Sequence, residues 1–236
     1  MQIYKKLFLL IALLLSFSYS NATVYGLFYG ANHNGLHCSE NDIIDLTKLY
    51  RDKGAQIIRI IGTGVNRQNV ITYLKRQAAA CKEEDMLVFA YSGHGCNQGI
   101  ACKNEFIYYS EIISIFNTSK ACRKVIFTGA CESGGIKDYV KNIHLPSNGH
   151  FIAMASSRKS ELAYEEEGAY RSYFYNRIIE GLNGMADANN DKIVTAKELF
   201  NYVEKTVRQD VDWMEDGEHP TAYGRFSDNL RLMSCQ

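Results

Sequence analysis

Five short apolar runs separated by segments of helical periodicity limit what this chain can fold into. The runs are VYGLFY, QIIRII, MLVFAY, KVIF and FIAMA, at residues 24–29, 56–61, 86–91, 124–127 and 151–155. Such short, almost continuously apolar runs are typical of strands buried on both faces of a parallel sheet. The alternation predicts right-handed crossovers and an α/β fold, a three-layer sandwich with a mostly parallel central sheet. Apolar residues recur at helical spacing in four other segments: Ile43, Leu46 and Tyr50; Val70, Ile71, Leu74 and Ala78; Tyr170, Phe174 and Ile178; and Leu199, Phe200, Val203 and Val207.

The N-terminus has the layout of a secretory signal peptide. Two lysines precede an apolar run over residues 7–17, and Ser20 and Ala22 are the small residues expected before a cleavage point. The run is too short to span a bilayer comfortably, although an uncleaved N-terminal anchor is the alternative. We therefore expect residues 1–22 to be a signal peptide and residues 23–236 to form one domain, which is secreted or extracytoplasmic and has no membrane association after cleavage.

The charge balance excludes some classes of partner. The chain has 26 basic and 26 acidic residues, and the basic residues form no stripe. Neither nucleic acid nor an anionic membrane surface is therefore expected as a partner. The sequence does not indicate an oligomeric state.

Cysteine positions allow disulfides but do not fix them. The seven cysteines lie at positions 38, 81, 96, 102, 122, 131 and 235, and export would permit them to pair. Cys96 and Cys102 bracket a short loop, and Cys81 and Cys122 each lie just before an apolar strand, so these are the two candidate disulfides. Reduced, buried thiols are the alternative. Cys131 is the odd cysteine that remains.

Two glycine-rich motifs follow consecutive apolar strands and carry a histidine and a cysteine. YSGHG, with His94, ends one strand, and TGACESGG, with Cys131, ends the next. Ligands of open parallel sheets bind at the carboxyl ends of the strands, and consecutive strands are usually neighbours. A thiol nucleophile needs a proton-transfer partner, for which imidazole is suited near neutral pH. The pattern favours a catalytic pair over the alternative of two tight turns with an inert thiol.

The residues around this pair have a mechanistic interpretation. The backbone N–H groups of Gly95 and Cys131 are candidates for stabilising a tetrahedral oxyanion, and glycine allows a substrate carbonyl to approach closely. Glu132 is less easily explained, because a neighbouring carboxylate disfavours a thiolate. We interpret its side chain as pointing toward the substrate.

These motifs resemble those of the caspase-like cysteine peptidases, which include caspases, metacaspases and legumain-like asparaginyl endopeptidases. GLHCSENDIIDLTKLY resembles the start of the first helix of metacaspases, and ASSRKSELAYEEEGAYRSYFYNRIIEGL resembles the segment after the nucleophile in bacterial members. The resemblance covers nearly all of residues 23–236. It implies that Cys131 is the nucleophile, His94 the general base and acid, and Gly95 an oxyanion donor, with protein or peptide substrates and no required cofactor.

The specificity implied by the resemblance is less direct. P1 is the substrate residue that contributes the carbonyl group of the cleaved peptide bond. Metacaspases bind a basic P1 side chain with an Asp two positions before the nucleophile. Here that position is Gly129. Asp42 and Ser92 match other positions of the metacaspase pocket, and with Glu132 and Ser156 they form the predicted P1 pocket. This favours cleavage after Arg or Lys, with cleavage after Asn as the alternative because ACESG is closest to the legumain form.

A loop late in the chain resembles a divergent EF-hand. The glycine expected at its sixth position is Lys192, which weakens the match. The alternative is a polar turn followed by a helix whose capping box is formed by Thr195 and Glu198. Calcium is therefore a candidate cofactor, with these candidate ligands: Asp187, Asn189, Asp191, Ile193 through its carbonyl, Thr195 and Glu198.

Two further groups are not expected to be binding sites. The acidic segment 165–167 is expected to be a solvated loop. His37, Cys38, His94, Cys96 and Cys102 match no standard zinc-ligand spacing.

The sequence therefore predicts a secreted cysteine endopeptidase that uses a Cys–His dyad and an acyl-enzyme. The alternatives are an asparaginyl endopeptidase or transamidase of the legumain type, and a catalytically silent caspase-like domain that acts as a binding or calcium-responsive module.

Overall fold

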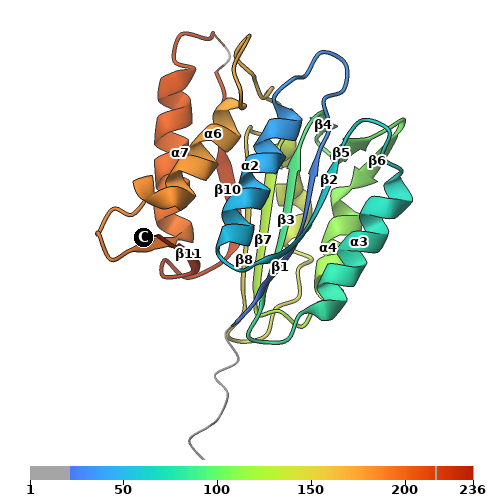
Figure 1. The fold of residues 1–236 in the computed structure, drawn as a ribbon, viewed down its shortest axis with the longest axis vertical. Coiled ribbons are helices and arrows are strands. Elements are labelled where there is room, and N and C mark those ends of the chain that lie inside the picture. Colours follow the sequence, from blue (N-terminus) through green and yellow to red (C-terminus); the bar gives the residue numbers. More distant parts are fainter. Residues whose placement is uncertain (1–21, 216, 236) are drawn as a thin grey trace, which may run out of the picture.

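The computed structural model describes residues 22–215 and 217–235, and most of the predicted signal peptide lies outside this range. Figure 1 shows a central sheet in which β10, the antiparallel edge strand, is followed by five parallel strands in the order β10-β8-β7-β3-β1-β2. The mostly parallel sheet is confirmed, and all five apolar runs are strands. The strands are β1 (Val24–Gly30), β2 (Gln56–Ile61), β3 (Met86–Ser92), β7 (Arg123–Gly129), β8 (His150–Ala155) and β10 (Thr221–Arg225).

Helices cover both faces of the sheet, which confirms the three-layer sandwich. One core contains α2 (Ser39–Asp52), α6 (Tyr173–Glu180) and α7 (Ala196–Asp210), and the opposite core contains α3 (Arg67–Ala80) and α4 (Tyr109–Thr118) (Figure 1). Successive residues of each strand enter opposite cores. Val88 and Ala90 of β3 face the first core, whereas Leu87 and Phe89 face the second. The inner strands β1, β3, β7 and β8 are almost continuously apolar because both of their faces are buried.

One predicted helical stripe begins too early. Tyr170 is outside α6 and is 57% exposed. The helix begins at Tyr173 because the side chain of Ser172 accepts a hydrogen bond from Tyr175 N, as an N-cap residue does. Only Phe174 and Ile178 of that stripe are therefore in the helix.

The small elements were not predicted. A three-stranded sheet of β4, β5 and β6 follows β3 directly, and β9 pairs with β11. Two irregular helices, η1 and η2, follow β7 and α6. Their bounds, with that of the short helix α5, are β4 (Gly95–Cys96), β5 (Gly99–Cys102), β6 (Glu105–Tyr108), β9 (Ile193–Thr195), β11 (Arg231–Ser234), η1 (Ser133–Ile136), η2 (Gly181–Met185) and α5 (Lys137–Val140).

Neither predicted disulfide forms, and all seven cysteines are free. The register of β4 and β5 pairs Cys96 with Gly99, so Cys102 is displaced along the hairpin, and its thiol donates to Val65 O.

The second predicted pair is separated by the register of β3 and β7. Cys122 N donates to Glu83 O, whereas Cys81 follows the last residue of α3 and its thiol donates to Gln77 O. A position just before each of two adjacent strands is therefore not enough to bring the two cysteines together, because the chain between α3 and β3 displaces Cys81 from the strand end.

The described helices give no indication of a membrane span. Within residues 22–215 and 217–235, each helix is too short or too polar to cross a bilayer.

A buried lysine generates a stability prediction. Lys124 in β7 is 1% exposed, and its Nζ donates only to His144 O, at 3.3 Å. Burial lowers its pKa, so the folded state penalises the protonated form. We expect Lys124→Met to raise the free energy of unfolding at pH 7 by up to about 1 kcal/mol, because apolar replacement of a buried ionic group is often stabilising.

Urea denaturation of the wild type and Lys124→Met measures this effect. The gain should shrink as pH rises toward 10.5, the ordinary pKa of lysine, because the charge is then lost in both states. Lys120→Met, at an exposed position nearby, is the matched control and should change stability by less than about 0.5 kcal/mol. A larger loss in Lys124→Met than in the control would contradict the prediction.

Candidate active site

The loops that carry His94 and Cys131 leave the sheet side by side. β3 and β7 are parallel neighbours whose register pairs Ser92 with Gly129, and Gly93 N donates to Gly129 O at 3.0 Å. His94 and Cys131 both line one cavity of about 130 Å³ at this edge of the sheet. The fold therefore brings the predicted nucleophile and its predicted partner to the wall of one cavity.

The imidazole of His94 is oriented by backbone groups. Its Nε2 lies 3.0 Å from His33 O, and because a carbonyl only accepts, Nε2 carries the proton of this contact. In a neutral imidazole, Nδ1 is then the basic nitrogen. The hydroxyl of Tyr91 lies 2.7 Å from His94 O and 3.0 Å from Ala101 O, which ties the histidine loop to the β4–β5 hairpin.

Cys131 lies at a sharp turn between β7 and η1. Glu132, the next residue, has a φ of 56°, in the left-handed region that costs a non-glycine residue free energy. Ala163 N lies 3.5 Å from Cys131 Sγ and donates to it. The thiol is partly exposed and also donates to Ala163 O at 3.8 Å, so both backbone groups of Ala163 contact the sulfur.

Glu132 is not brought to the cavity. Its Oε2 accepts a hydrogen bond from Asn97 N at 3.0 Å, in the turn between β4 and β5. Because its backbone is left-handed, the side chain turns toward this hairpin, and Glu132 is not among the residues that line the cavity. The carboxylate next to the thiol therefore joins η1 to the hairpin.

Asp42 is fully buried beneath the cavity wall. Its Oδ2 accepts hydrogen bonds from the hydroxyls of Ser92 and Ser172, both at 2.7 Å, and its Oδ1 accepts one from Ser172 N. Ser92 and Ser172 line the cavity, whereas Asp42 does not. Burial raises the pKa of Asp42 to about 7, although the serine hydrogen bonds oppose the rise.

Ser156 and Gly95 both contact the backbone beside Cys131. Ser156 lines the cavity, and its hydroxyl accepts from Ala130 N and donates to Ala130 O, each at 3.1 Å. A Cβ atom at Gly95 would lie only 2.8 Å from Ala130 Cβ and 3.3 Å from Cys131 O. The His94 and Cys131 loops approach each other so closely that glycine is required at position 95.

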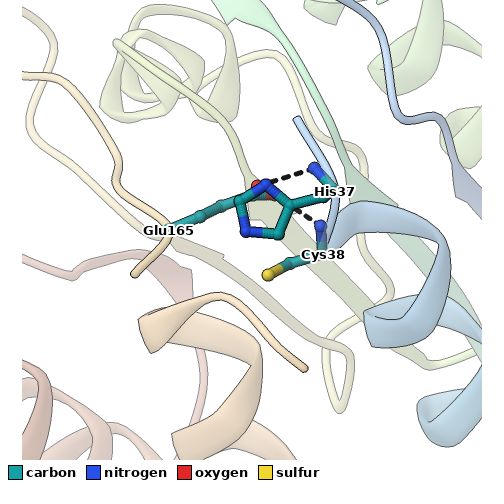
Figure 2. A group of neighbouring side chains, drawn as sticks. All are labelled: His37, Cys38 and Glu165. Carbon is teal, nitrogen blue, oxygen red and sulfur yellow. Dashed lines mark hydrogen bonds and ion pairs between the residues drawn. The ribbon is translucent and has the colours of Figure 1, made fainter. Parts of the chain in front are cut away.

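Two carboxylates in the cavity wall, Glu165 and Glu218, were missed by sequence reasoning. Glu165 is at the start of the segment expected to be a solvated loop. Its carboxylate accepts hydrogen bonds from His37 N at 2.9 Å and Cys38 N at 3.2 Å, and so caps the N-terminus of α2 from another part of the chain (Figure 2). No local pattern would have revealed either residue, because both are brought in by long-range packing.

Glu165 also takes part in the one group of potential metal ligands in the described part of the chain. Atoms of His37, Cys38 and Glu165 lie within 4.8 Å of one another, and Figure 2 shows them around the carboxylate. Burial and the nearby carboxylates raise the pKa of the Cys38 thiol to about 12, and the thiol donates to Ala169 O. This arrangement is explained by capping of α2 and contains only two of the five residues weighed for zinc.

The EF-hand-like loop forms the polar turn and capping box of the alternative interpretation. Asp187 accepts hydrogen bonds from Asp191 N and Lys192 N, and Lys192, at the position of the expected glycine, has a φ of 65°. Glu198 caps α7 with Thr195. Within the described residues, the carboxylates of Asp187, Asp191 and Glu198 do not gather as close ligands. Nothing tests whether Asn189 and the carbonyl of Ile193 are calcium ligands, and calcium binding stays a prediction.

Comparison with known proteins decides the family. The model of the caspase domain family matches residues 17–227. The chain belongs to the caspase domain family. The family is one of cysteine-type peptidases, and a peptidase of this kind would act on protein or peptide substrates.

Solved structures show the same fold at low sequence identity. This caspase-domain chain is similar to caspase-1 from Spodoptera frugiperda, with 15% identity, a TM-score of 0.68, and coverage of 92% of this chain and 93% of that chain. The structure of pro-sf-caspase-1 matches with 14% identity, a TM-score of 0.67, and coverage of 90% and 95%. Protein GSU0716 from Geobacter sulfurreducens matches with 14% identity, a TM-score of 0.65, and coverage of 91% and 100%. A search of curated proteins found no match.

In this caspase-domain chain, Tyr175 occupies the space beside Gly129, the position where the metacaspase pattern has an acid. A Cβ atom at Gly129 would lie 2.7 Å from Tyr175 Cε2. The ring of Tyr175 is fixed there because its hydroxyl donates to Tyr91 O at 2.8 Å, with Phe127 O at 3.2 Å. The space that an acidic side chain would need at position 129 is therefore filled by Tyr175.

We expect Gly129→Ala to lower the free energy of unfolding by about 1–3 kcal/mol, as overpacking in a rigid core does. Gly64→Ala is the matched control, because a Cβ atom there meets nothing within 4 Å. Denaturation of both variants measures the difference. Equal stability of the two would show that Tyr175 moves aside without cost.

Proposed function

We propose that this chain is a secreted cysteine endopeptidase in which Cys131 is the nucleophile and His94 the general base and acid. One observation carries the proposal: in a chain of the caspase domain family, both side chains line the same cavity at the end of adjacent strands. Secretion is supported by the pattern of residues 1–22 alone.

The proposed reaction follows from the atoms around the cavity. Nδ1 of His94 takes the proton of the Cys131 thiol, and the thiolate attacks the scissile carbonyl carbon. The oxyanion of the tetrahedral intermediate accepts hydrogen bonds from the N–H groups of Gly95 and Cys131. When the C–N bond breaks, His94 gives its proton to the leaving amine, and an acyl-enzyme remains. His94 then takes a proton from water, which attacks the thioester and releases the carboxylic acid and the thiol.

The surrounding groups assist this chemistry by holding both reactants. The backbone of Ala163 positions the sulfur, and the His33 carbonyl holds the imidazole with Nδ1 as its basic nitrogen. Ser156 fixes the backbone directly before the nucleophile. Preorganised contacts of this kind lower the barrier because little reorganisation is needed during the reaction.

We further propose that the P1 residue is Arg or Lys. Glu165 and Glu218 line the cavity, Asp42 lies directly behind Ser92 and Ser172, and no Lys or Arg lines the described cavity wall. An acidic pocket favours a cationic side chain and repels an anionic one. Asp42 would act here through the two serines that it holds, rather than by direct contact with substrate.

The dyad is tested by active-site labelling. An acyloxymethyl ketone probe with Arg at P1 should label the wild-type protein and Cys122→Ala, whose thiol lies before β7 at the far end of the strand. It should not label Cys131→Ala, and His94→Ala should lose peptidase activity by at least about 10³-fold. A wild-type protein that is neither labelled nor active would support a catalytically silent binding module instead.

Specificity is tested with fluorogenic peptides that differ only at P1. We expect the highest kcat/KM for Arg and Lys, because their charge is complementary to the carboxylates of the cavity. Best turnover of an Asn substrate would support the legumain-type alternative, and best turnover of an Asp substrate would contradict the acidic pocket. Addition of a free amine nucleophile to the same assays reports transamidation.

A further inference from the structure

The cavity wall contains a buried carboxylate with one unused oxygen. Glu218 lies three residues before β10 and is 1% exposed. Its Oε2 accepts a hydrogen bond from Tyr164 N at 2.9 Å, and Tyr164 also lines the cavity. Its Oε1 is buried and has no hydrogen-bond partner. A buried carboxylate oxygen without a partner is costly, and its presence needs an explanation.

No cation of the described residues compensates for this carboxylate. Nδ1 of His219, the next residue, lies 3.2 Å from a carboxylate oxygen of Glu161, and Arg208, which borders the hollow beside Glu218, pairs with Glu204 at 2.9 Å. The other two acids near the cavity are already satisfied. Asp42 is held by two serines, and both oxygens of Glu165 are used to cap α2. Glu218 is therefore the acid of this region that retains a free acceptor.

We propose that Glu218 binds the positively charged side chain of Arg or Lys at P1 by an ion pair through Oε1. The inference rests on the proposed function, since it names the specificity determinant of the same site. Glu218 reaches the cavity from the segment just before the edge strand β10, and so supplies the charge that position 129 cannot hold because Tyr175 fills that space. It is a binding residue and takes no part in proton transfer.

Burial makes this interaction pH-dependent. Burial, aided by the charges of Asp42 and Glu161, raises the pKa of Glu218 to about 8, so at neutral pH the free carboxyl is largely protonated. A bound cation favours the ionised form, so binding releases a proton and tightens as pH rises toward 8. Titratable groups surround Glu218 on several elements. In and near the cavity they are Asp42 from α2, Tyr173 from α6, Glu161 and Glu165 from the loop after β8, and His94 and Cys131. In the adjoining hollow they are Arg208 from α7, Asp212 and Glu215 from the segment after it, and His219 beside Glu218.

The kinetic test compares Arg with citrulline, its neutral isostere, at P1. Glu218→Gln should lower kcat/KM for the Arg substrate by about 30-fold or more, the lower end of what removal of one partner of a buried charge pair costs. The loss should appear mainly in KM, and kcat/KM for the citrulline substrate should change by less than about threefold. In the wild type, KM for the Arg substrate should fall between pH 6 and pH 8.5, and this slope should be absent in Glu218→Gln.

Glu161→Gln is the matched control, because Glu161 is a neighbouring carboxylate that does not line the cavity. Its effect on the Arg substrate should stay below about threefold if a specific ion pair, rather than the general negative field, is responsible. Thermal denaturation checks folding. Folding raises the pKa of Glu218 from 4.5 to about 8, so the ionised carboxylate is less favourable in the folded than in the unfolded protein. The resulting loss of stability grows between pH 4.5 and about pH 8 and is fully present above about pH 8. Glu218→Gln should therefore be at least as stable as the wild type at about pH 8.5.

A binding experiment separates this inference from the proposed function. Calorimetry with Cys131→Ala should show binding of Nα-acetyl-argininamide with release of protons, and no comparable binding of Nα-acetyl-citrullinamide. The double variant Cys131→Ala/Glu218→Gln should lose argininamide binding. Retained binding in the double variant, or equal binding of both amides, would overturn the role of Glu218 even if the wild type is an active peptidase. If argininamide binding depends on Glu218 but the wild-type protein cleaves no peptide, the inference is supported and the proposed function is contradicted.

Discussion

The parallel pairing of β3 with β7 is the constraint on which the candidate site depends. It sets Ser92 opposite Gly129, so the loops that carry His94 and Cys131 start at the same level of the sheet. A slip by two residues would keep each side chain on its own face but move one loop by about 7 Å relative to the other. The close approach of Gly95 to Ala130 and Cys131 allows no such slip. The register of two strands therefore determines the distance between a sulfur and an imidazole that are far apart in sequence.

A second layer of contacts explains why the pocket acid is not where the family resemblance suggested. Asp42 joins α2 to the end of β3 and the start of α6 through two serine hydroxyls. Tyr175, three residues after Ser172, then lies against Gly129 and bonds to the backbone of β3 and β7. The start of α6 is thus fixed by one buried carboxylate and in turn closes the space beside the nucleophile. In the proposed pocket, the charge that recognises the substrate therefore comes from other elements.

The sequence predicted what depends on local pattern and missed what depends on long-range packing. Continuous apolar runs revealed the five parallel strands, and glycine-flanked motifs at two strand ends predicted that His94 and Cys131 would lie at one edge of the sheet, where both line the same cavity. β10 was missed because no residue of this edge strand is buried, so it lacks the apolar run of a central strand. The direction of Glu132 depends on a left-handed φ, and the separation of Cys81 from Cys122 depends on register. Glu218 could not be predicted from local sequence, because its contact in the cavity wall is with Tyr164 N, 54 residues earlier.

The discrimination expected of this pocket comes as much from repulsion as from attraction. An aspartate at P1 would add a negative charge beside Glu165 and would hold Glu218 in its protonated form, with no lysine or arginine in the described wall to offset the charge. Because burial weakens screening by salt, this like-charge cost persists at physiological ionic strength. A cationic side chain reverses the balance, since it supplies the partner that Glu218 lacks. The unmet hydrogen-bonding capacity of the free protein and the proposed selectivity for a cationic P1 residue would then be two consequences of the same buried carboxylate.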